Sequence, residues 1–248
     1  MKKINLSILL LVLSLAGFTQ TVFLEKGKIE FERKTNVHRL YFAGENDGFA
    51  EEFKKLIPAF KTDYFELVFS GSKTLYKPGK ESPDQKATFF ESPANANTIY
   101  KDLGAGRLIS QKQVYETQFL LADSMPALEW KMEAETRNIA GYECRKAVSR
   151  ICDSVVVVAF YTDEILPSSG PESMGGLPGM ILGLAIPRLY TTWFATKVEM
   201  INTAEEQKIT PPQKGKKSTQ PEMISRVRES IKNWGEKYYH KAIWFTSL

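Results

Sequence analysis

Apolar and polar residues alternate with a period of two over much of this 248-residue chain. The clearest run is LEWKMEAE at residues 128–135, in which apolar and charged residues alternate at every position. This alternation predicts a strand with one packed face and one solvated face. The same pattern recurs at residues 28–33, 64–69, 115–121 and 193–200. Because clean alternation is typical of sheets that are wet on one side, it favours an antiparallel sheet.

A long hairpin and one early helix add to this pattern. Residues 141–151 and 155–162 flank the turn signal Asp153-Ser154 and predict the two strands of the hairpin. The early helix would begin after Asn46-Asp47, whose side chains can cap it. Its apolar stripe at helical spacing consists of Phe49, Phe53, Leu56 and Phe60.

A second helix is predicted near the C-terminus. Thr219 and Glu222 have the spacing of a capping box, Pro221 suits the first turn, and Gly235 can end the helix. The apolar stripe of this helix consists of Ile224, Val227, Ile231 and Trp234.

Together these elements predict a mainly β (α+β) fold. We expect a single curved antiparallel sheet or open barrel with one or two packed helices, similar by analogy to lipoprotein-carrier and lipocalin-like folds. The β domain would span residues 21–202, and the C-terminal helix and tail residues 221–248. Residues 203–220 form a basic, proline-containing linker, for which a solvated loop is favoured over an electrostatic arm for acidic partners.

The first residues predict export from the cytoplasm. Residues 1–20 have the pattern of a secretory signal peptide, with Lys2 and Lys3 before a short apolar run. This run is too short to span a bilayer, and no second stretch of spanning length follows, so we expect no transmembrane helix in the mature chain. The expected location is the periplasm, the outer-membrane surface or the medium.

Composition and charge narrow the function classes. The sequence is 43% hydrophobic and 25% charged, which excludes a collagen-like or wholly disordered chain. The formal charge is +4, and it falls to +2 when Lys2 and Lys3 are removed with the signal segment. This charge gives no support for a nucleic-acid partner. Two histidines and two cysteines leave little material for a metal site, so we predict no metal and no cofactor.

The two cysteines, Cys144 and Cys152, are close in sequence but poorly spaced for a disulfide. In one continuous strand they would lie about 26 Å apart. A disulfide requires Cα atoms within about 7 Å, and the obvious turn signal comes only after Cys152. We therefore predict two unpaired thiols that are buried or partly buried, although export would otherwise favour a disulfide.

A glycine-rich loop is the candidate binding site. In SSGPESMGGLPGMILGL, residues 168–184, proline and glycine occupy the central positions of a type II turn, and an apolar run follows. The apolar residues would either be displayed around this turn to contact a ligand or partner, or fill the core while the glycines supply unusual backbone angles. The candidate residues are Gly175, Gly176, Leu177, Pro178, Gly179, Met180 and Ile181.

This loop, read as GLPGMI, resembles the signature of the GLPGLI family of exported bacterial proteins. The resemblance extends to FELVFSGSKTLY (65–76), ALEWKMEAETRNIAGYECRKA (127–147) and AFYTDEILPSSGP (159–171), and it covers most of residues 25–200. Met180 and the segment 152–154 depart mildly from the family pattern. The resemblance implies export, one β-rich domain and a characteristic loop, and it supplies no catalytic residues.

No catalytic set is evident in the sequence. Cys144 as a nucleophile would need His38 or His240 as its base, and nothing in the sequence brings them together. Asp163 and Glu164 are adjacent in a strand and would point to opposite faces. We therefore predict a non-enzymatic module that binds a hydrophobic ligand, an outer-membrane protein or another cell-envelope partner. The alternatives are an accessory subunit of an outer-membrane transport or secretion assembly, and an envelope hydrolase.

Overall fold

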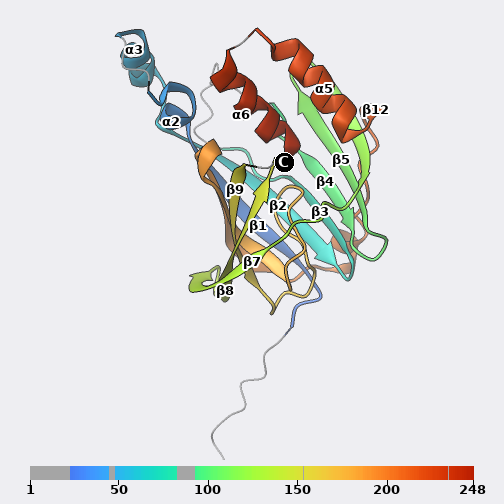
Figure 1. Cartoon of the computed structure of the whole chain (residues 1–248). Helices are drawn as coiled ribbons and strands as arrows, with labels where there is room; N and C mark the ends of the chain where they lie inside the picture. Colours follow the sequence, from blue (N-terminus) through green and yellow to red (C-terminus); the bar gives the residue numbers. More distant parts are fainter. Residues whose placement is uncertain (1–22, 45–47, 83–92, 153, 234) are drawn as a thin grey trace, which may run out of the picture.

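The fold is seen in a computed structural model (Figure 1), which describes residues 23–44, 48–82, 93–152, 154–233 and 235–248. The predicted signal peptide, the capping residues Asn46-Asp47, and the residues Asp153 and Trp234 lie outside the described residues.

The described residues form one 12-stranded sheet, in the order β12-β6-β5-β4-β3-β2-β1-β11-β10-β9-β8-β7. All neighbouring strands are antiparallel except β12, which runs parallel to β6 at one edge. The strands are β1 (Lys26–Asn36), β2 (Phe60–Ser70), β3 (Lys73–Pro78), β4 (Thr98–Asp102), β5 (Arg107–Val114), β6 (Thr117–Ser124), β7 (Lys131–Ile139), β8 (Tyr142–Ile151), β9 (Val155–Thr162), β10 (Met180–Ile186), β11 (Thr191–Glu199) and β12 (Lys216–Ser218).

Four of the described helices gather at two places on the curved sheet. The last two helices lie together over β4 and β5, and the first two project from another corner (Figure 1). The helices are α2 (Val37–Phe42), α3 (Gly48–Leu56), α4 (Thr203–Glu206), α5 (Gln220–Ile231), α6 (Glu236–Ser247) and the 3-10 helix η1 (Pro187–Leu189).

The sequence predicted this fold class correctly: a mainly β chain with one curved antiparallel sheet and packed helices. The hairpin at 141–162 is confirmed as β8 and β9. The capping box of α5 is also confirmed, since the Thr219 hydroxyl accepts from the Glu222 amide at 3.4 Å and the Glu222 carboxylate accepts from the Thr219 amide at 3.0 Å. Helices α2 and α6 were not predicted, and Phe60 belongs to β2 rather than to the helix before it.

The strand with the clearest alternation differs from its prediction. Residues 131–138 of β7 are exposed on both faces, and Met132 is 48% exposed. The reason is that β7 is the edge of the sheet and pairs only with β8. Leu128 and Trp130, just before the strand, pack against the main core, and within β7 the last residue, Ile139, is buried in it.

Three hydrophobic clusters hold the sheet and helices together. The largest includes inward residues of β1, β2, β10 and β11, with Trp193 fully buried. The second packs Met223, Val227 and Ile231 of α5 against β5 and β6. The third lies on the other side of β2, because neighbouring strand residues point to opposite faces. It joins Val68, Leu75 and Tyr100 to Ile201 and Ile209.

Candidate functional site

Two charged residues occupy inward positions of central strands. Arg33 continues the buried series Ile29 and Phe31 along β1, and its directly opposite partner on β2 is Asp63. The two residues are 2% and 9% exposed. Since a buried charge is costly unless it is paired, this cross-strand pair is the first candidate for a functional group.

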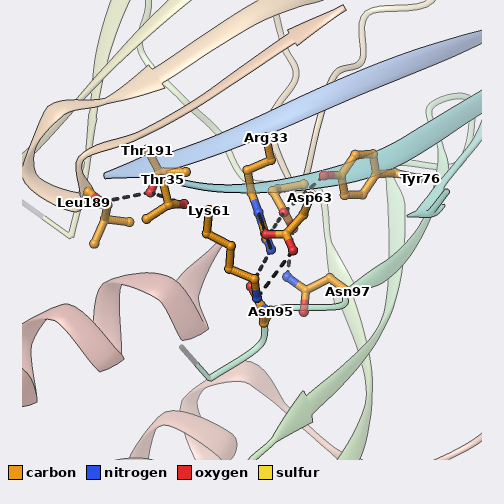
Figure 2. Close-up of polar contacts among 10 residues, drawn as sticks. Arg33, Thr35, Lys61, Asp63, Tyr76, Asn95, Asn97, Leu189 and Thr191 are labelled. Carbon is orange, nitrogen blue, oxygen red and sulfur yellow. Dashed lines mark hydrogen bonds and ion pairs between the residues drawn. The ribbon is translucent and has the colours of Figure 1, made fainter. Parts of the chain in front are cut away.

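The Arg33 guanidinium holds Asp63 through two hydrogen bonds. Its Nη2 and Nε atoms donate to Oδ2 of Asp63 at 2.7 and 3.2 Å, and Nη2 also donates to the amide oxygen of Asn95. Lys61 Nζ lies 3.4 Å from the other carboxylate oxygen of Asp63. Figure 2 shows Arg33, Lys61 and Asp63 pointing toward one another. Asp63 is therefore fixed between two cations.

A second carboxylate, Glu172, extends this network into the core. It is 1% exposed, and its Oε1 lies 3.9 Å from the Arg33 guanidinium. Asn97 donates to Glu172 at 2.8 Å and the Tyr76 hydroxyl donates to it at 3.3 Å. Burial, followed by the charge of Glu172, raises the pKa of Tyr76 well above its usual value. We call Arg33, Asp63, Tyr76, Asn97 and Glu172 the central network.

A pocket of about 320 Å³ opens beside the central network. Phe65 contributes to its wall, and the guanidinium of Arg33 lies 4.6 Å above the centre of that ring. The polar groups around the pocket are planar amides, the carboxylates of Asp63 and Glu81, hydroxyls and cations, all of which can hydrogen-bond polar ligands. The lining residues with hydrogen-bonding side chains include Arg33, Lys61, Asp63, Asn95, Gln113 and Tyr115.

A fully buried lysine fixes the glycine-rich loop beneath this site. Lys101 Nζ donates to the backbone oxygens of Gly170 and Met174 at 2.9 and 2.6 Å and to the Ser169 hydroxyl at 3.3 Å. Burial lowers the pKa of Lys101 to about 7, against a smaller opposing effect of Glu172. The loop is thus held by contacts from β4.

The candidate loop residues fill the core. Leu177, Met180 and Ile181 are 1%, 0% and 0% exposed, Gly175 and Gly179 are buried, and only Gly176 and Pro178 are exposed. Of the two arrangements left open for this loop, the structure has the one in which the apolar side chains pack inward. Glu172, from the same loop, is the residue that joins the central network.

The backbone conformation of this loop requires glycine at position 179. Gly179 has a φ of +118°, and a Cβ there would lie 2.0 Å from the Thr162 carbonyl oxygen. Its amide donates to the Leu177 carbonyl at 2.7 Å, which closes a three-residue turn at Pro178. Gly179 therefore serves a close approach of two backbone segments.

The cysteine candidates lie apart and offer no evident nucleophile. Cys144 is fully buried and donates to the Tyr142 carbonyl at 3.5 Å, whereas Cys152 is exposed at the tip of the β8–β9 hairpin. Burial raises the pKa of Cys144 to about 12, so its thiol stays protonated at neutral pH. His38 instead contacts the Ile57 carbonyl at 3.0 Å. Both thiols are free, but only Cys144 is buried as expected.

Sequence reasoning missed the central network, although the pattern contained a signal for it. Arg33 and Asp63 stand at positions where the period-two alternation calls for apolar residues, and so do Lys101 and Lys112. A charged residue in the buried phase of a strand marks a paired or functional group. Glu172 lies in a loop and carries no such periodic signal.

The described part of the chain contains no group of three or more histidine, cysteine, aspartate or glutamate side chains placed to hold a metal ion. Among the described helices, none is long and apolar enough to cross a membrane. Export remains a prediction.

Comparison with known protein families gives one match. Residues 65–220, more than half of the chain, match the family model described as "N-glycanase peptide, N-terminal domain". Asn95, Gln113 and Glu172 lie within the matched segment, whereas Arg33 and Asp63 precede it. A comparison with curated proteins found no match.

Two crystal structures of PNGF-II share the fold. The structure in space group P21 is 18% identical to this chain, with a TM-score of 0.51, and the match covers 78% of this chain and 32% of that one. The structure in space group C2 is 15% identical, with the same TM-score, and the match covers 89% and 33%. This chain therefore spans about a third of the length of those proteins.

These matches overturn the predicted family, the predicted function and the predicted absence of an enzymatic role. The resemblance to the GLPGLI family is wrong, because the family model that matches residues 65–220 is that of an N-glycanase domain. The prediction of a non-enzymatic module for a hydrophobic ligand or envelope partner is wrong for the same reason. The motif did not identify the family because a tight glycine-proline turn before a buried strand can occur in unrelated folds. Glycine is needed wherever the backbone has a positive φ or approaches another segment closely. Of the alternatives, the matches favour the hydrolase.

Proposed function

Because the chain belongs to the family described as "N-glycanase peptide, N-terminal domain", we propose that it serves the hydrolytic release of N-linked glycans. Its role is to bind the glycan of the substrate in the pocket beside Arg33 and Asp63. Since the chain spans about a third of the PNGF-II structures, it acts as one part of such a hydrolase. The observation that carries the proposal is a buried, fixed ion pair at the wall of a polar pocket.

The chemistry of the pocket suits a sugar. Sugar hydroxyls both donate and accept hydrogen bonds, and planar side chains can bind two neighbouring hydroxyls at once. Asp63 and Asn95 supply such planar groups, and both are held in place by Arg33. Tyr115, 36% exposed at the rim, offers an aromatic face.

The polar side chains of the pocket are held in position before a ligand binds. A side chain that is already held loses little conformational entropy when the ligand arrives, so its hydrogen bonds contribute more to affinity. Arg33 is held by Asp63, by Asn95 and by the Phe65 ring. In this arrangement Arg33 is a positioning residue, and Asp63, Asn95 and Gln113 contact the sugar.

Binding and hydrolysis of a defined glycopeptide test the proposal. The probe is a short peptide with an asparagine-linked GlcNAc disaccharide, measured by calorimetry against the same peptide without sugar. We expect Gln113→Ala and Asn95→Ala each to weaken binding by about tenfold, the effect of one lost hydrogen bond to a polar ligand. Mass spectrometry of the peptide, which detects conversion of asparagine to aspartate, reports whether the chain itself cleaves the bond.

The controls separate binding from folding. Asp63→Asn removes one charge inside the pocket, and Asp163→Asn removes one charge from an exposed pair with Arg145, 3.5 Å long. The proposal predicts loss of glycopeptide binding in the first variant and not in the second. Because Asp63 also supports the fold, the exposed Gln113 is the decisive position. Equal affinity for the glycosylated and bare peptides would overturn the proposal.

A further inference from the structure

A second pocket lies between the C-terminal helices and the β8–β9 hairpin, and it shares no lining residue with the first. Its volume is about 470 Å³, within the range that holds a small ligand. We call it the C-terminal pocket. Its lining comes from α5, α6, η1 and the hairpin tip, and it includes Cys152, Arg188, Arg228, His240, Ile243 and Trp244.

The described residues that line the C-terminal pocket include two arginines. Arg188 and Arg228 are both exposed on its lining, and neither forms an ion pair with a carboxylate among the described residues. No aspartate or glutamate stands among the described residues of the lining. Two guanidinium groups around one cavity, neither of them paired with an acidic side chain in the described part of the chain, favour an anion, since arginine binds carboxylates and sulfates through paired hydrogen bonds.

Aromatic contacts hold the cationic side of the pocket in place. The guanidinium of Arg188 lies 5.5 Å from the centre of the Trp244 ring, and the His240 ring stacks on Trp244 at 5.8 Å. Such cation–π contacts orient a guanidinium without neutralising it. Ile243, 7% exposed, gives the pocket an apolar floor. The pocket therefore combines a positioned positive charge with an apolar surface.

We propose that the C-terminal pocket binds an acidic sugar, that is, a pyranose ring that carries a carboxylate or a sulfate. The ring lies on the apolar floor, and the anionic group binds Arg188 and Arg228. The choice of a sugar rests on the proposed function, whereas the choice of an anion rests on the charge of the lining alone. The same pocket is a second point of contact for a charged glycan.

Three probes that share the pyranose ring test this proposal by calorimetry on the full chain. They are methyl glucuronide, glucose 6-sulfate and the neutral methyl glucoside. We expect the anionic probes to bind and the neutral one to bind at least tenfold more weakly. A preference for glucuronide over the sulfate identifies a carboxylate ligand, and the reverse preference identifies a sulfate ester.

Matched variants locate the binding. Arg188→Gln and Arg228→Gln should each weaken binding of the preferred anion about tenfold. Arg226→Gln removes the same charge from the same helix as Arg228 but from outside the pocket lining, and it should leave the affinity unchanged. An equal loss in Arg226→Gln would show general charge attraction and would overturn the proposal.

The reactivity of the Cys152 thiol reports on binding in the C-terminal pocket and not in the first pocket. It is an exposed thiol in the lining, whereas Cys144 is fully buried. Bound ligand should slow the alkylation of Cys152 by iodoacetamide, and Gln113→Ala in the first pocket should not change that protection. Alkylation unaffected by any anionic probe would overturn the proposal. Protection of Cys152 without glycopeptide binding elsewhere would refute only the proposed function.

Discussion

Two of the regions in which opposite charges meet have very different surroundings. In the central network, Arg33, Asp63 and Glu172 are 2%, 9% and 1% exposed. On the edge hairpin of β7 and β8, Lys146 lies 2.8 Å from Glu135 and 3.1 Å from Glu133, with all of these side chains partly open to water. The distances are similar, and the difference is burial.

Burial decides what each network contributes. Water screens the pairs of the edge hairpin, so each of them adds little to stability. The central charges have lost their hydration, and each depends on the others to compensate for that loss. A ligand that enters the first pocket meets groups already held in position, which is an advantage that the edge hairpin does not offer.

The largest effect should follow from removing one central carboxylate. Glu172→Ala would remove the carboxylate that Arg33, Tyr76 and Asn97 contact. We expect the free energy of unfolding to fall by about 3–5 kcal/mol. Urea unfolding followed by circular dichroism measures the change. The matched variant Glu135→Ala on the edge hairpin should leave the unfolding midpoint nearly unchanged. If both variants lost the same stability, burial would not distinguish the two regions.

The buried lysines should make stability depend on pH. Burial lowers the pKa of Lys101 to about 7 and that of Lys112 to about 8, from an ordinary value of 10.5. Between these values and 10.5 the unfolded chain binds more protons, so stability should rise with pH, by up to about 1.4 kcal/mol per pH unit for each lysine.

Urea unfolding from pH 8 to pH 10 measures this rise. The window ends near pH 10 because the buried Tyr76, whose pKa is raised, would then favour the unfolded state. Lys101→Met should flatten the rise, and Lys146→Met on the edge hairpin should not, because contacts with Glu135 and Glu133 raise the pKa of Lys146. A flat profile in the unmodified chain would contradict the burial of both lysines.

A smaller effect on stability is expected from the exposed hydrogen bond that caps helix α5. Thr219 is exposed, but its hydroxyl accepts from the Glu222 amide at the start of α5. Thr219→Ala should lower the free energy of unfolding by about 1 kcal/mol, because a backbone donor loses its partner. Thr219→Ser should restore most of it, as measured by thermal unfolding. Equal stability of the two variants would contradict a capping role.

The sequence by itself determined the elements whose causes are local. Alternation predicted β1, β2 and β11, a turn signal between two segments predicted the β8–β9 hairpin, and the capping box predicted the start of α5. Each of these depends on residues a few positions apart, which a pattern records directly. The family prediction from the glycine motif was wrong. A glycine such as Gly179 is required by a positive φ and a close backbone contact, and unrelated proteins share that requirement.

Only the tertiary structure decided which positions are buried and which side chains meet. Both faces of β7 are exposed because it is the edge strand of the sheet. The alternation within β7 does not reveal the order of the strands. The central network joins Arg33 to Asp63 over 30 residues and Tyr76 to Glu172 over 96. Such partners meet because strands and a loop distant in sequence pack together, so the site exists only once the sheet has formed.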